Sequence, residues 1–80
     1  MNVEEISTSL IKMMNESEYL DVNVNNGNQT FEEMDLNSIE LVAVLCEVEK
    51  FFNIEFDDEQ LIVSLEISVN ELAKMVSEKL

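Results

Sequence analysis

Hydrophobic residues recur at helical spacing near both ends of the chain. The first group follows an i, i+4, i+7, i+8 pattern, which predicts a helix over residues 3–17. Its members are Ile6, Leu10, Met13 and Met14. The last group predicts a helix that begins at Ser68, where Glu71, three residues later, completes a capping signature. Its inner face comprises Leu72, Met75, Val76 and Leu80.

A polar stretch separates the first helix from the next apolar segment. Residues 21–31 are rich in asparagine, and Asn26-Gly27 is a turn signal, so a loop is predicted there. The alternation of Val22 and Val24 leaves a short hairpin as the alternative.

The most apolar segment of the chain begins directly after Asn37. Asn37 is a good N-cap, and Glu40 completes the reciprocal pattern of a capping box, so a helix is predicted over residues 38–52. On one side of this helix an apolar stripe forms the natural core face. It comprises Leu41, Val44, Leu45, Val48 and Phe52.

A second apolar stripe falls on nearly the opposite side. It comprises Ile39, Val42, Ala43 and Cys46, bordered by Glu40, Glu47, Glu49 and Lys50. We interpret it as an exposed docking strip rimmed by acid; the alternative is a central helix with both stripes in the core.

A further short helix is predicted over residues 57–65, opened by Asp57 and Gln60. The predicted fold class is therefore all-α. We expect a small four-helix bundle with a long loop between the first two helices, formed by residues 1–80 as one domain.

Composition and charge exclude several classes of function. The net charge is −14, from 18 acidic residues and four lysines, so nucleic acid is a poor partner. Proteins with basic patches are better partners, although acidity can also serve solubility alone. Cys46 is the only cysteine and there is no histidine, which excludes an internal disulfide and a zinc cluster. With neither a targeting peptide nor a membrane-spanning run expected, the predicted location is the cytoplasm, with no membrane partner.

Ser38 is the candidate reactive residue. It stands at a helix start in a chain without histidine, so it cannot be a self-activated nucleophile, but another enzyme could attach a group to it. Asn37-Ser38-Ile39 resembles the Asp-Ser-Leu motif of the acyl carrier protein and peptidyl carrier protein family. Other positions that resemble the family at matching spacing are Phe31, Met34, Phe52, Phe56, Asp58, Glu59 and Leu61.

The resemblance implies a carrier rather than an enzyme. Ser38 would bear 4′-phosphopantetheine, transferred from coenzyme A by a phosphopantetheinyl transferase, and the thiol of the arm would carry acyl or aminoacyl thioesters. It also implies loading and condensing enzymes with basic docking patches as partners of a monomeric carrier. The docking residues would be Asn37, Ile39, Glu40, Val42, Cys46, Glu47 and Glu49. Residues that could line an acyl-chain site, or simply form the core, are Leu41, Leu45, Val48, Phe52 and Phe56.

The chain also departs from the family pattern. Asp35 replaces a glycine that many fatty-acid carriers have, Asn37 replaces the acid before serine, and Ala43 stands where many of them have glutamate. These differences favour a carrier of a specialised pathway, such as polyketide or nonribosomal peptide synthesis, over a housekeeping fatty-acid carrier.

Two alternatives come from other classes of protein. One is weak calcium binding by a loop that resembles an EF-hand, although Asn26 stands at its sixth position, where glycine is needed. Its ligands would be Asp21, Asn23, Asn25 and Glu32. The other is an unmodified acidic helical adaptor that binds a partner helix.

Overall fold

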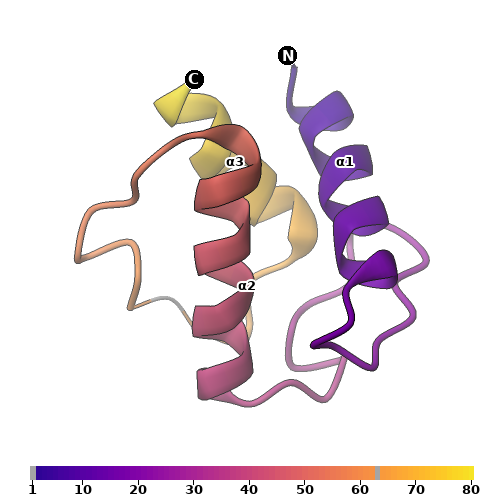
Figure 1. The fold of residues 1–80 in the computed structure, drawn as a ribbon. Coiled ribbons are helices and arrows are strands. Elements are labelled where there is room, and N and C mark those ends of the chain that lie inside the picture. Colours follow the sequence, from indigo (N-terminus) through magenta and orange to yellow (C-terminus); the bar gives the residue numbers. More distant parts are fainter. Residues whose placement is uncertain (1, 63) are drawn as a thin grey trace.

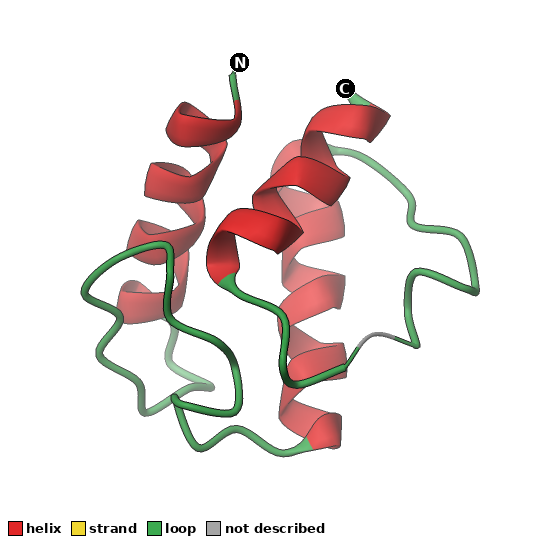
Figure 2. Cartoon of the chain, turned by 180° about the vertical axis from the view of Figure 1, so that it is seen from behind, coloured by secondary structure: helices red, strands yellow, loops and turns green. Residues whose placement is uncertain are grey.

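A computed structural model describes residues 2–62 and 64–80. Within them the chain forms three helices, α1 (Val3–Glu16), α2 (Ser38–Phe52) and α3 (Val69–Lys79), as Figure 1 shows. The same residues contain no strand, and their one β-bridge pairs Thr30 with Ser68. Seen from behind in Figure 2, long loops join the helices. None of the helices in this part of the chain is long and apolar enough to cross a membrane.

Each helix begins with a complete capping box. The pairs are Asn2 with Glu5, Asn37 with Glu40, and Ser68 with Glu71. In each pair the cap side chain accepts the backbone N–H of the glutamate, and the glutamate carboxylate accepts the backbone N–H of the cap residue. These bonds satisfy two backbone donors that a helix start otherwise leaves unpaired. The caps predicted at Asn37 and Ser68 are confirmed.

The helix predicted over residues 57–65 is wrong for the described part of that segment. Its capping signal forms, since the Asp57 N–H donates to Gln60 Oε1 at 2.8 Å, but only one turn of backbone bonds follows. The physical reason is that none of the apolar side chains in the described part of this segment is fully buried. Leu61 and Leu65 are half-buried and Ile62 is 85% exposed, so packing does not offset the cost of a short helix. The bundle therefore has three helices in the described residues instead of four. Val63, within the predicted helix, lies outside them.

The connection between α1 and α2 is held down by asparagine side chains. The Asn15 side chain bonds both the N–H and the C=O of Val24, at 2.7 and 3.0 Å. This pairing uses the backbone groups that a hairpin strand would need, and the alternative hairpin at Val22 and Val24 does not form. Near the middle of the loop, the Asn70 N–H donates to the Gly27 carbonyl at 2.9 Å, which ties the loop to the start of α3.

A single helical turn at residues 31–35 leads the chain into α2. Thr30 and Glu33 cap it reciprocally at its start. At its end the Leu36 N–H donates to the Phe31 carbonyl and the Asp35 N–H to the Glu32 carbonyl. These two bonds, with Asp35 in the left-handed region at φ 63°, make a Schellman motif.

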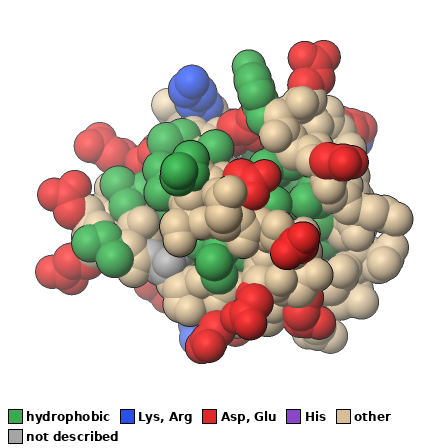
Figure 3. Space-filling model, turned by 90° about the horizontal axis from the view of Figure 1, so that it is seen from below, with side chains coloured by type: hydrophobic (Ala, Val, Ile, Leu, Met, Phe, Trp, Pro, Cys, Tyr) green, Lys and Arg blue, Asp and Glu red, His purple; other side chains and the backbone are tan. Residues whose placement is uncertain are grey.

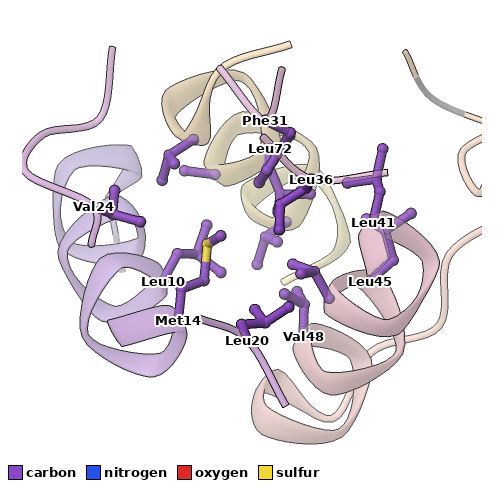
Figure 4. Close-up of a cluster of buried hydrophobic side chains, with 14 of the residues drawn as sticks. Leu10, Met14, Leu20, Val24, Phe31, Leu36, Leu41, Leu45, Val48 and Leu72 are labelled. Carbon is purple, nitrogen blue, oxygen red and sulfur yellow. The ribbon is translucent and has the colours of Figure 1, made fainter. Parts of the chain in front are cut away.

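One hydrophobic core joins the helices and the loop. Figure 4 shows side chains from α1, α2, α3 and the first loop pointing toward a common centre, among them Leu10, Leu36, Leu45 and Leu72. Phe31 is also fully buried there. Because Phe31 lies in the helical turn and Leu36 directly follows it, the core fixes the segment that precedes Ser38.

Candidate functional site

Ser38 is the first residue of α2 and is exposed to solvent. Two capping bonds of ordinary length span it: the Glu40 N–H donates to Asn37 Oδ1 at 2.8 Å, and the Asn37 N–H donates to Glu40 Oε1 at 3.0 Å. The site therefore combines an accessible hydroxyl with a rigid helix start.

The helix start leaves two N–H groups beside the hydroxyl. The first backbone bond of α2 runs from the Leu41 N–H to the Asn37 carbonyl at 3.0 Å. Helical geometry thus gives the N–H groups of Ser38 and Ile39 no acceptor, whereas that of Glu40 is capped. Free N–H groups and the positive end of the helix dipole favour a phosphate at this position. The donor set of this helix start thus fits a phosphodiester on Ser38.

An exposed apolar strip continues from Ser38 along the outer side of α2. Ile39 is 81% exposed and Val42 46% exposed, and Cys46 is also exposed. Figure 3 views the end of the molecule where α2 begins, and hydrophobic side chains lie at its surface among many acidic ones. Of the two interpretations of this stripe, the structure supports the exposed one.

The acidic residues predicted to rim this strip also have structural partners. Glu40 is half-buried in the capping box, and the half-buried Glu49 accepts the N–H of Phe56 through Oε2 at 2.8 Å. Glu47 lies apart from them, beside a surface hollow of about 330 Å³ that Met13 and Phe51 also line. The three carboxylates thus do not converge on one point.

The predicted inner stripe of α2 lies in the core. Leu41, Val44, Leu45 and Val48 are buried, and Phe52 is half-buried. Phe56, which follows the helix, is also buried. Their side chains pack against other core residues, so the structure gives them a packing role.

Sequence reasoning missed Ile62 as a surface residue. It is as exposed as Ile39, although the predicted helix over residues 57–65 would have placed its apolar residues inward. The run of apolar residues gave no signal of this exposure, because a buried and an exposed apolar run look alike in sequence.

The EF-hand-like alternative lacks the flanking helices that such a loop requires. α1 ends at Glu16, well before Asp21, and α2 begins only at Ser38. Among the described residues, no group of three or more acidic or cysteine side chains could hold a metal ion.

A comparison with protein-family models matched residues 9–76 to the family described as phosphopantetheine attachment site. Comparisons with curated proteins and with solved structures gave no significant match. The matched region includes α2, the helical turn before it and nearly all of the core.

Proposed function

The chain belongs to the phosphopantetheine attachment site family, and we propose that Ser38 is the residue that bears the group. The cofactor of this family is 4′-phosphopantetheine, and the chain is a phosphopantetheine carrier. When bound, the group supplies a flexible arm whose terminal thiol carries acyl or aminoacyl groups as thioesters.

The observation that carries the proposal is the setting of Ser38. Its hydroxyl is exposed at the first position of α2, beside two backbone N–H groups without a helical acceptor. These donors favour the phosphodiester once it is formed. Ser38 needs no base of its own, because a separate transferase supplies the activation.

The partners of the carrier dock on the apolar strip of α2 in this proposal. Ile39 and Val42 supply apolar contact area close to Ser38, and the negative charge of the chain draws in enzymes with basic patches. A phosphopantetheinyl transferase binds first, followed by loading and condensing enzymes. Glu40 and Glu49 keep their internal bonds and offer their remaining oxygens to the partner.

The pathway that we propose is a specialised one, such as polyketide or nonribosomal peptide synthesis. Asn37 places a neutral amide before the serine, and Ala43 leaves an exposed position of α2 without charge. Both changes remove negative charge from the surface around Ser38, which alters the partners that the carrier can attract.

Mass spectrometry tests the attachment residue. Incubation with coenzyme A, Mg²⁺ and a broad-specificity transferase should add one phosphopantetheine group, about 340 Da, to the protein. Ser38→Ala should abolish the addition, whereas the matched Ser9→Ala variant on α1 should be modified like the wild type. Addition that survives Ser38→Ala, or no addition to a folded wild-type protein, would refute the proposal.

A further inference from the structure

We propose that Asn26 is a site of spontaneous covalent modification, at which the side-chain amide is lost by attack of the Gly27 backbone nitrogen. The product is aspartate or isoaspartate at position 26. This modification does not depend on the role of Ser38, because it involves a different segment of the chain.

The reaction needs only water. The Gly27 nitrogen gives up its proton and forms a bond to Asn26 Cγ, while the bond from Cγ to the side-chain nitrogen breaks and ammonia leaves with the proton. Water then opens the resulting five-membered imide at either carbonyl. Opening at one carbonyl gives aspartate, and opening at the other gives isoaspartate; nothing is oxidised or reduced.

The attacking nitrogen is available in the folded protein. Gly27 is the only glycine of the chain, so no other asparagine is followed by a residue without a side chain. Among the described residues, no group accepts a hydrogen bond from the Gly27 N–H. Asn26 itself is exposed, so water can reach the imide.

A backbone donor is already aimed at the oxygen on which charge develops. Asn26 Oδ1 accepts the N–H of Asn28 at 2.9 Å. Addition of the Gly27 nitrogen to Cγ makes this oxygen negative, and a donor fixed in advance stabilises that charge without reorganisation. The loop thus supplies the electrostatic part of the reaction as well as the nucleophile.

Two other asparagines of the fold, Asn15 and Asn70, are more constrained. Asn15 uses both ends of its amide on Val24, and Asn70 is bonded through Oδ1 to Ser7 and through Nδ2 to Asn28. Losing either amide would break bonds to neighbouring segments. Asn26 differs from these two because its amide nitrogen makes no hydrogen bond to the described residues.

Isoaspartate at this position would release the loop from α3. It inserts an extra methylene into the backbone directly before Gly27, whose carbonyl accepts the Asn70 N–H at 2.9 Å. Two residues further on, the Gln29 carbonyl accepts the Val69 N–H at 3.1 Å. Lengthening the chain moves both carbonyls, so we expect the modified protein to be less stable and its loop to exchange amide protons faster.

The test is ageing of the full-length folded protein at mildly alkaline pH, followed by peptide mass mapping and labelling with an isoaspartate-specific methyltransferase. Asn26 should convert about tenfold or more faster than Asn25, its neighbour in the same exposed loop, which corresponds to ~1.4 kcal/mol of barrier. Asn26→Ser should abolish isoaspartate formation while keeping an oxygen acceptor for Asn28. The matched variant Asn25→Ser should convert like the wild type.

A second sample, aged in denaturant, separates sequence from structure. Conversion of Asn26 in the folded protein at a rate equal to or above that of the denatured chain supports the proposal. An intact amide in the folded protein, with conversion only after denaturation, would overturn it and show that the packing of Gly27 against Asn70 protects the site.

Discussion

Replacing Asp35 with glycine should stabilise the protein, because Asp35 ends the helical turn before α2 with φ at 63°. The left-handed region destabilises a residue with a Cβ by about 1–2 kcal/mol, and for aspartate this strain lies toward the lower end of the range. Glycine removes that strain but adds freedom to the unfolded chain, worth about 0.5–1 kcal/mol. Because glycine at the end of a Schellman motif is common, we expect the strain to outweigh the added freedom, with a net gain of up to about 0.5 kcal/mol.

Thermal unfolding followed by circular dichroism measures this gain. In a domain of this size, 1 kcal/mol corresponds to about 4–8 °C, so Asp35→Gly should raise the Tm by up to about 4 °C. The same change at Asp21, an exposed loop aspartate without a positive φ, should lower the Tm, since there glycine brings only its entropic cost. Asp35→Val should lower it further, because a β-branched side chain tolerates the left-handed region poorly.

The reasoning fails if Asp35→Gly has the same Tm as the wild type or a lower one. Such a result would mean that the aspartate side chain stabilises the turn by more than its backbone strain. Asp35→Asn separates this possibility, because asparagine keeps the tolerance for positive φ and removes only the charge.

Other positions give further predictions. Asn37→Ala should lower the free energy of unfolding measured in urea by about 1 kcal/mol, because the cap is lost. Asn37→Asp should keep the cap and most of the stability. Leu45→Ala, at a fully buried position, should cost about 2–5 kcal/mol in the same assay; a smaller loss would mean that the core collapses around the gap. Gly27→Ala should be destabilising, because the added Cβ would clash with Asn70 Oδ1, and the double variant with Asn70→Ala should recover part of the loss. Ile39→Ala should leave the Tm within about 1 °C of the wild-type value, because the side chain is 81% exposed. It should lower kcat/KM for the transferase, because the proposed docking contact is lost, and an unchanged kcat/KM would remove Ile39 from the docking surface.

The sequence predicted α2 well because its signals are local. Asn37 and Glu40 lie within one turn of each other, and the helix that they begin is found at Ser38–Phe52 as predicted. The spacing of Leu45 and Val48 likewise identified the core face, since a helix of known period fixes which residues share a side. The position of Ser38 at an exposed helix start therefore followed from the sequence.

The segment after α2 shows where local signals fail. Asp57 and Gln60 form the predicted hydrogen bond, yet the turn is not extended into a helix. Whether a short helix persists depends on the apolar surface that other segments offer to it, and that surface is a property of the assembled fold. Exposure of Ile62 has the same origin.

By itself, then, the sequence determined the helical class, the caps at Asn37 and Ser68, the core face of α2 and the place of Ser38. Tertiary structure decided that the second apolar stripe of α2 faces solvent instead of a neighbouring segment, and it kept Glu49 bonded to the backbone of Phe56. It also placed Gly27 against Asn70, far along the chain, and put Asp35 in a left-handed conformation before the helix. The division has one physical reason: caps and helical period act over a few residues, whereas burial and close packing depend on segments that only folding brings together.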